Sequence, residues 1–296
     1  MHCSNRVVLL HVRGLVTMSW CSRSSRVATL SLATFSLVSW STTKPSQQPL
    51  LLRRTADCTV CHSCRPDAEA LRDPCLTRMR RRSPDSFRAL WQTNYGRFEV
   101  TCVRARAPVW VDRLYNLLAA GFYDDMFFLR VVNSTSLKVV QFGTAGDPTI
   151  SRVYNWSTTT SPCGILEPQP DVMPFCTATQ PCPGVPGLSN TFGTLSMSTS
   201  FNERTKTTWN ATSELFINTG DNSWLDAMRF VPICDVDAAG MATVLRFPSF
   251  GELSDLGGSG PSLGRLYEEG NSYITGSPEW GPSMARAWTA RLCTST

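Results

Sequence analysis

Four cysteines early in the chain are spaced closely enough to share one metal ion. Cys58, Cys61, Cys64 and Cys75 form the pattern C-x2-C-x2-C-x10-C, with His62 inside it. Four thiolates at such spacing can close a tetrahedral zinc site or hold an iron–sulfur cluster. A zinc ribbon, however, needs two separated C-x2-C knuckles, and the second knuckle is missing. Disulfides in an exported segment, or no fixed role, are therefore the preferred interpretations, and we expect no metal.

Histidine is confined to the start of the chain, which removes several classes of catalysis from the rest. The three histidines are His2, His11 and His62. Residues 87–296 therefore cannot form a Ser-His-Asp or Cys-His relay, a His-ligated zinc site or a His general base. The Gly-rich stretch 257–260 lacks the lysine of a phosphate-binding loop. Chemistry in this region must use arginine, carboxylates, hydroxyls, thiols or shape.

The charge distribution argues against a nucleic-acid partner. The chain of 296 residues has a formal net charge of +5. Residues 1–86 hold 13 Lys and Arg against 5 Asp and Glu, whereas residues 87–296 hold 15 against 18. Phosphate binding needs cations gathered on one folded surface, and the excess lies outside the acidic main part.

The composition divides the chain into four segments. Residues 1–54 lack acidic residues and resemble a targeting segment or a disordered one. Three alternatives remain open: a signal peptide with its apolar part at 27–40, a transit peptide, and mistranslated upstream sequence with the real start at Met18 or Met79. We expect a Cys/Arg-rich linker over 55–86, a folded domain over 87–276 and a C-terminal tail over 277–296. The apolar stretch 27–40 is short and interrupted, so stable membrane insertion is not expected.

The folded part is dominated by strand patterns. Residues 95–103 alternate as a strand, and residues 109–120 have helical periodicity between Pro108 and Gly121. Further strand-like runs occur at 126–132, 137–142, 193–198, 214–218 and 229–236. Many short strands separated by Gly, Pro, Asn and Ser predict a mainly β domain, either a barrel or a sandwich.

Read in order, several of these runs resemble a divergent cyclophilin-type peptidyl-prolyl cis-trans isomerase. The resemblance is carried by F-F-L-R-V-V at 127–132, V-V-Q-F-G at 139–143, G-T-L-S-M at 193–197, S-E-L-F-I-N at 213–218 and W-L-D at 224–226. It implies a closed, eight-stranded antiparallel β-barrel with capping helices. It also implies an enzyme that rotates X-Pro bonds of proline-containing polypeptides, assists protein folding and needs no cofactor. We expect a monomer.

The resemblance assigns roles to individual residues. Arg130 corresponds to the catalytic arginine, which would donate to the imide nitrogen as its conjugation is lost. Substrate binding is implied for the following residues: Gln141, Val139, Met197, Ser198, Thr199, Phe216, Trp224 and Leu225. Among these, Gln141 would bind the substrate backbone, while Val139, Phe216 and Leu225 would form the apolar wall of a proline pocket with Trp224 at its rim.

The chain also departs from the family pattern. Leu129 replaces a histidine before the arginine, and Ser198-Thr199-Ser200 replaces the common Ala-Asn-Ala. Glu214 takes the place of a glutamine. Ten residues separate Arg130 from Gln141 where seven are usual, and the extra residues fall at 133–137. These departures favour weak activity, or binding without catalysis, as the alternative function.

The compartment is not determined by these patterns, and the secretory pathway is only favoured over an organelle. Three sequons begin at Asn133, Asn155 and Asn210. In an oxidising lumen, Cys163, Cys176 and Cys182 would be candidates for a loop disulfide. A glycan on Asn133 would crowd the proline pocket, so Asn155 and Asn210 are the expected acceptors.

Overall fold

The computed structural model describes residues 7–9, 58–60, 65–166, 188–202 and 207–294. All of them belong to one unit, made of residues 1–14 and 58–296. The expected targeting segment, residues 1–54, lies outside the described residues apart from 7–9.

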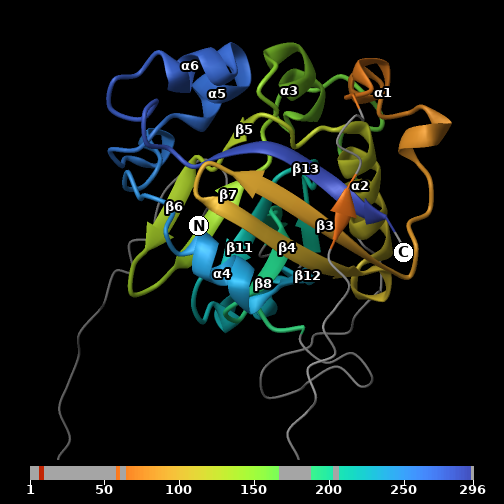
Figure 1. The fold of residues 1–296 in the computed structure, drawn as a ribbon, viewed down its shortest axis with the longest axis horizontal. Helices are drawn as coiled ribbons and strands as arrows, with labels where there is room; N and C mark the ends of the chain where they lie inside the picture. The colour runs from red at the N-terminus through yellow and green to blue at the C-terminus, as the bar shows by residue number, and fades with distance from the viewer. Residues whose placement is uncertain (1–6, 10–57, 61–64, 167–187, 203–206, 295–296) are drawn as a thin grey trace, which may run out of the picture. The chain divides into compact units, whose positions relative to one another are not determined.

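The unit is built on one large antiparallel sheet (Figure 1). Its strands follow the spatial order β2-β13-β3-β4-β12-β8-β11-β7-β6, and β5 pairs with β13. The strands of this sheet are β2 (Thr59–Val60), β3 (Ser86–Thr93), β4 (Gly96–Val103), β5 (Met126–Phe127), β6 (Arg130–Asn133), β7 (Lys138–Phe142), β8 (Thr194–Met197), β11 (Leu215–Asn218), β12 (Pro232–Val236) and β13 (Arg286–Thr294). A second, three-stranded sheet has the order β1-β9-β10, with β1 (Val7–Leu9), β9 (Ser200–Asn202) and β10 (Thr207–Trp209).

The expectation of a closed, eight-stranded barrel is confirmed only in part. The sheet is antiparallel and curled, but it has ten strands, and its path ends at β2 and β6 without a ladder joining these two among the described residues. The ends still approach each other, because β5 pairs with β13 and β6 follows β5 after two residues. The architecture is therefore an open half-barrel.

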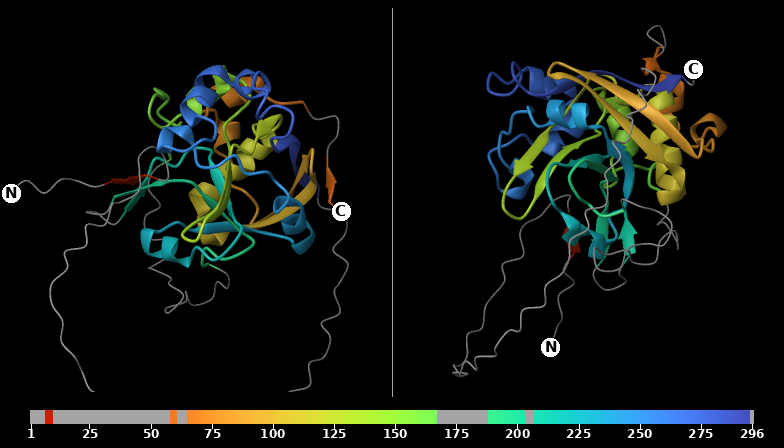
Figure 2. Two further views of the ribbon diagram at one scale, coloured as in Figure 1. Left: turned by 90° about the vertical axis from the view of Figure 1, so that its left-hand side faces the viewer. Right: turned by 60° about the horizontal axis from the view of Figure 1, so that its bottom comes forward.

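Six α-helices and four 3-10 turns flank the sheet over the described residues. They are α1 (Ala68–Arg72), α2 (Pro108–Ala120), α3 (Pro148–Tyr154), α4 (Ala238–Val244), α5 (Leu263–Glu269), α6 (Asn271–Thr275), η1 (Thr77–Met79), η2 (Arg104–Arg106), η3 (Ser223–Met228) and η4 (Ser254–Leu256). Helices α1, α3, α5 and α6 gather at one end of the sheet, and α4 lies at the other (Figures 1 and 2).

Helix α2 forms where the sequence predicts it. Pro108 occupies its first turn, and Gly121 ends it in a left-handed conformation with φ of 78°. Proline is favoured in the first turn because it has no N–H to satisfy, and glycine adopts positive φ without a Cβ penalty. The apolar face of α2, with Trp110, Val111 and Leu114, is fully buried in the main core inside the sheet.

Two segment boundaries expected from composition are wrong. Residues 65–86 are no linker, because Leu71 and Met79 belong to the main core and Cys75 is bonded to Cys163. Residues 277–296 are no tail, because β13 pairs with β2, β3 and β5. The folded unit therefore extends beyond 87–276 in both directions.

Three disulfides connect distant parts of the described chain. Cys58 joins Cys293, Cys75 joins Cys163, and Cys102 joins Cys234 across strands β4 and β12. The expectation of a loop disulfide among Cys163, Cys176 and Cys182 is therefore wrong for Cys163, because its partner is Cys75. The other two cysteines of that group lie outside the described residues.

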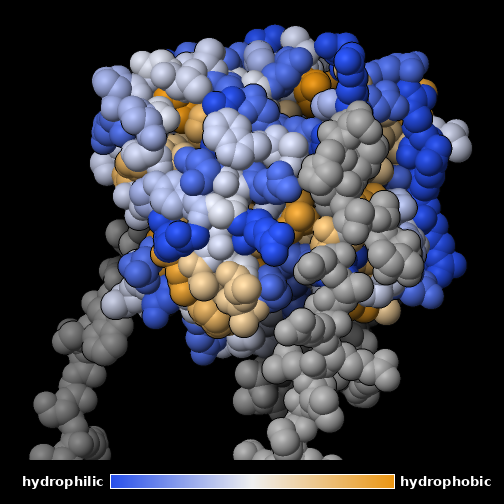
Figure 3. Space-filling model, viewed as in Figure 1, coloured by the Kyte–Doolittle hydropathy of each residue, from blue (hydrophilic) through white to orange (hydrophobic). Residues whose placement is uncertain are grey.

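The surface seen in Figure 3 is mostly hydrophilic, with hydrophobic area gathered over α4. Leu245, which follows α4, is exposed. No helix in the described part of the chain is long and apolar enough to cross a membrane.

Candidate active site

Three neighbouring strands place four of the expected catalytic and binding side chains on one face of the sheet. Gln141 on β7 lies opposite Arg130 on β6 and opposite Phe216 on β11. Directly opposed residues of antiparallel strands share a face, and Val139 joins them because it lies two residues from Gln141. The alternate residues, including Val140, point to the other face and fill the main core.

The insertion between Arg130 and Gln141 does not change their register. Strand β6 pairs with β7 from Arg130–Gln141 to Asn133–Lys138, without a shift. The extra residues form the connecting turn, which is closed by a 2.9 Å hydrogen bond from Ser134 N to the Leu137 carbonyl. A longer hairpin loop therefore leaves the two key side chains opposed.

A continuous line of hydrogen bonds runs through five polar side chains. Arg130 Nη1 donates to Gln141 Oε1 at 2.8 Å, and Gln141 Nε2 donates to Glu214 Oε2 at 2.8 Å. Tyr267 donates its hydroxyl proton to Glu214 Oε1. At the other end, Arg130 Nε and Nη2 donate to Glu252 Oε1 and Oε2, both at 2.7 Å. Nothing in the local sequence signals that Glu252 and Tyr267 belong to this site.

The five side chains of this hydrogen-bonded line are largely buried. The Arg130 side chain is 4% exposed, whereas that of Glu252 is 32% exposed. Glu214 is buried as well. Burial, and after it the neighbouring Glu214 carboxylate, raises the pKa of Tyr267 well above its usual value. Tyr267 therefore remains a neutral hydrogen-bond donor throughout the neutral pH range.

The expected wall of the proline pocket forms a distinct apolar cluster beside this line. Val139, Phe216 and Leu225 pack with Phe201 and Phe230, and the first three are at most 2% exposed. The rings of Phe216 and Phe230 meet edge to face at 5.9 Å. The family resemblance assigned no role in this wall to Phe201 or Phe230. A proline ring could reach the wall only after a covering side chain moved.

The 3-10 turn η3 carries Leu225 into this cluster and Trp224 to its edge. Trp224 is 48% exposed, and its indole N–H donates to the Ser136 carbonyl in the inserted turn at 3.1 Å. The buried Asn222 side chain accepts from Lys138 N and donates to Lys138 O, which fastens η3 to β7. This anchor was not anticipated from the sequence.

The other three expected binding residues divide between two places. Met197 pairs with Leu215 on the opposite face and is buried in the main core, so its side chain does not reach the site. Ser198 and Thr199 line a small cavity of about 10 Å³ with Glu214. Their hydroxyls and the Asn210 amide nitrogen are buried without a hydrogen-bond partner in the described part of the chain. A cavity of this size holds about one water molecule.

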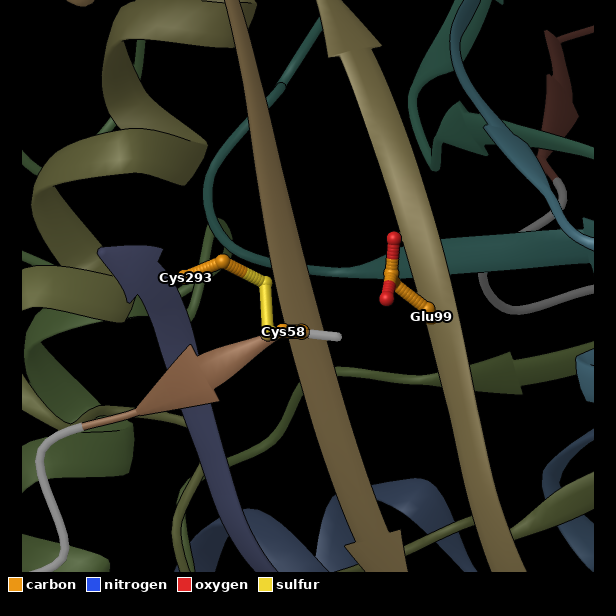
Figure 4. Close-up of side chains that lie close together, drawn as sticks. All are labelled: Cys58, Glu99 and Cys293. Carbon is orange, nitrogen blue, oxygen red and sulfur yellow. A yellow bond between two sulfur atoms is a disulfide. The ribbon is translucent and has the colours of Figure 1, made fainter. Parts of the chain in front are cut away.

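The cysteine motif does not assemble a shared metal site among the described residues. Cys58 and Cys75 belong to different disulfides, and Cys61 and Cys64 lie outside the described residues. Cys58, Glu99 and Cys293 do lie together (Figure 4). The two sulfurs are bonded to each other in a disulfide, and Glu99 is paired with Arg88. These three residues therefore offer no free thiolate to a metal ion.

The family is shown by comparison with known proteins. Residues 89–253, more than half of the chain, match the model for cyclophilin type peptidyl-prolyl cis-trans isomerase. The chain therefore belongs to the cyclophilin-type peptidyl-prolyl cis-trans isomerases, a family of enzymes. No curated protein matches the chain.

Two similar solved structures are of a Cryptosporidium parvum cyclophilin-type peptidyl-prolyl cis-trans isomerase, the second in the presence of the dipeptide Ala-Pro. They share 16% and 15% sequence identity with this chain, each with a TM-score of 0.43. The matches cover 71% and 70% of this chain and 99% of each of those chains.

Proposed function

We propose that this protein rotates X-Pro peptide bonds in other polypeptides, with Arg130 as the donor to the imide nitrogen, and that it thereby assists folding. The observation that carries the proposal is the placement of Arg130. It lies on the same sheet face as Gln141 and next to the apolar cluster of Val139, Phe216 and Leu225. A charged donor beside an apolar wall is the arrangement that the reaction needs.

The reaction requires only electrostatic help. Rotation about an X-Pro bond passes a barrier of about 18–20 kcal/mol and takes tens to hundreds of seconds unaided. No bond is made or broken, but the twisted imide nitrogen gains a lone pair. A fixed cationic donor stabilises this state more than the planar ground state. Turnover near 10³ s⁻¹ would require about 7 kcal/mol of such stabilisation.

Gln141 would bind the substrate backbone. Its side chain is already held in one orientation between Arg130 and Glu214. Because ordered groups lose little entropy on binding, this arrangement favours a substrate placed directly over the guanidinium. The role does not depend on histidine, in agreement with the composition of residues 87–296.

A coupled cis/trans assay on an Ala-Ala-Pro-Phe peptide with the full chain tests the proposal. We expect Arg130→Ala to lower kcat/KM by at least 100-fold. Arg265→Ala is the matched control, because Arg265 also forms a two-point ion pair with a glutamate, Glu269, but lies on the exposed α5. Equal rates for the wild type and Arg130→Ala would refute the assignment.

A binding module that grips proline-containing segments without accelerating rotation is the second candidate. Two observations favour it: Arg130 is already paired with Glu252, and the apolar wall is buried. NMR shift changes on peptide addition, without enhanced exchange between cis and trans peaks, would support this function over catalysis.

A further inference from the structure

We infer that Glu252 is a positioning residue for Arg130, and that its carboxylate holds the guanidinium in the orientation that the isomerase reaction uses. The inference rests on the proposed function. Glu252 lies 122 residues from Arg130 in the sequence, and it grips the guanidinium at two points, Nε and Nη2, each at 2.7 Å. A parallel, two-point arginine–carboxylate contact is the strongest and most directional form of this interaction.

The contacts leave part of the guanidinium available. Glu252 takes one N–H from Nε and one from Nη2, and Gln141 takes one from Nη1. Arginine has five such groups, so one on Nη1 and one on Nη2 remain unused by the residues that the structure describes. Glu252 and Gln141 therefore fix the plane of the guanidinium while leaving a donor on each terminal nitrogen for the substrate.

The loop that carries Glu252 is shaped to present this side chain. Gly260 N donates to the Glu252 carbonyl at 2.7 Å, and Leu253 N donates to Glu252 Oε1 at 2.8 Å. A Cβ on Gly258 would lie 2.1 Å from the Glu252 carbonyl oxygen, which excludes any larger residue without movement of the loop. Leu253 is buried in a second apolar cluster with Phe127 and Leu129. The loop is thus anchored directly beside Glu252.

Two effects of this carboxylate on the reaction have opposite signs. Its negative charge lowers the positive potential of Arg130, which would slow the rotation. Its two hydrogen bonds restrict a long side chain that otherwise samples many rotamers, which would speed the rotation. Because the guanidinium is buried and held at a second point by Gln141, we infer that positioning outweighs the loss of potential.

Glu252→Gln shows which of the two effects outweighs the other, because it keeps the shape and one acceptor but removes both the charge and the second contact. We expect kcat to fall about tenfold with KM unchanged within twofold. Glu252→Asp keeps the charge on a shorter arm, so its kcat should lie between those of Glu252→Gln and the wild type. Glu269→Gln, which breaks the exposed pair with Arg265, is the matched control and should leave kcat unchanged. An unchanged or increased kcat in Glu252→Gln would overturn the inference.

A second measurement does not depend on activity. With ¹⁵N-labelled arginine, the two-point contact should slow rotation of the Arg130 guanidinium and give separate Nη signals in the wild type. Glu252→Gln should merge these signals, while the melting temperature reports whether the variant is folded. If the wild type shows no isomerase activity, the proposed function fails, yet separate signals that merge in the variant still establish the holding contact. Signals that are the same in both proteins would overturn it.

Discussion

At the scale of single residues, the polar line of the site has a fixed direction of hydrogen bonding. Arginine can only donate and an ionised carboxylate can only accept. Between Arg130 and Glu214, the amide of Gln141 must therefore turn its oxygen to the arginine and its nitrogen to the carboxylate. Tyr267, which lies on α5, donates a hydrogen bond to the other carboxylate oxygen of Glu214. Glu214 thus orients Gln141 as well as bringing a negative charge to the site.

Tyr267→Phe tests this line by removing one hydroxyl without changing the shape of the ring. We expect the free energy of unfolding at pH 7 to fall by about 1–3 kcal/mol, because buried Glu214 loses the hydrogen bond from Tyr267. Urea denaturation measures this loss. Tyr95→Phe is a suitable control, since the Tyr95 hydroxyl donates to Ser283 O in an exposed position.

The same variant changes the dependence of stability on alkaline pH. Burial raises the pKa of Tyr267 in the folded state above about 10, the value in the unfolded chain. The contribution of this pKa difference to the free energy of unfolding is therefore complete below pH 10. It is lost as the pH rises further, at about 1.4 kcal/mol per pH unit. Tyr267→Phe should lose stability less steeply between pH 10 and 11 than the wild type. Equal slopes would mean that Tyr267 ionises freely in the folded protein.

One sequon expectation is wrong at this scale. Asn210 was expected to lie on an accessible polar loop, but it is 7% exposed and its amide nitrogen is buried. The folded protein does not present it for modification. Asn133, by contrast, lies exposed at the end of β6, three residues from Arg130.

At the scale of elements, the short turn η3 determines whether the apolar wall is complete. Asn222 satisfies both backbone groups of Lys138 and thereby joins η3 to β7. Asn222→Ala should lower the free energy of unfolding by about 1–3 kcal/mol and raise KM several-fold, because Leu225 is no longer held in place. Peptide titration followed by NMR measures the change in affinity. Asp221→Asn, next to it on the exposed side, should leave both quantities nearly unchanged.

Elements with strong local signals could be predicted from the sequence. Helix α2 and strands β4, β7, β8, β11 and β12 lie within or next to the predicted runs. Strand β13 was missed for a physical reason: a register shift between Ala287 and Thr289 breaks the two-residue alternation. The side chains of Ala287 and Ala290 are buried, but alanine is a weak signal for a strand.

The candidate site was predictable only where family motifs run along single strands. Arg130, Gln141 and Phe216 are on one face because strand register brings them together. Glu252 and Tyr267 arrive from a loop and a helix after α4, by contacts that no local pattern encodes. Met197 shows the converse error: its neighbours matched the family, but the side-chain period of two turns it into the core.

At the scale of the whole molecule, the three disulfides among the described residues connect segments that are far apart in the sequence. We expect the Cys102→Ala/Cys234→Ala pair to destabilise more than the Cys58→Ser/Cys293→Ser pair. The first disulfide is fully buried between β4 and β12, whereas the second closes a two-residue ladder at the end of the sheet. Loss of a native disulfide costs about 2–5 kcal/mol, and the buried pair should lie at the upper end.

Urea denaturation of the two paired variants, with mass-spectrometric mapping of the disulfides in the wild type, measures this order. The reverse ranking would mean that the longer sequence separation of the Cys58–Cys293 disulfide contributes more than burial of the sulfurs.

The position of β13 also determines when the protein can fold during its synthesis. This strand is made after every other strand described in the structure, yet it lies between β2 and β3, whose residues are made much earlier. The hairpin of β3 and β4 is made well before β13, so the outer hydrogen-bonding edge of β3 stays unpaired until residues 286–294 have been made. An unpaired edge of this kind invites association with other nascent chains. The outer edge of β3 is therefore the part of the unfinished sheet that most needs protection until β13 has paired with it.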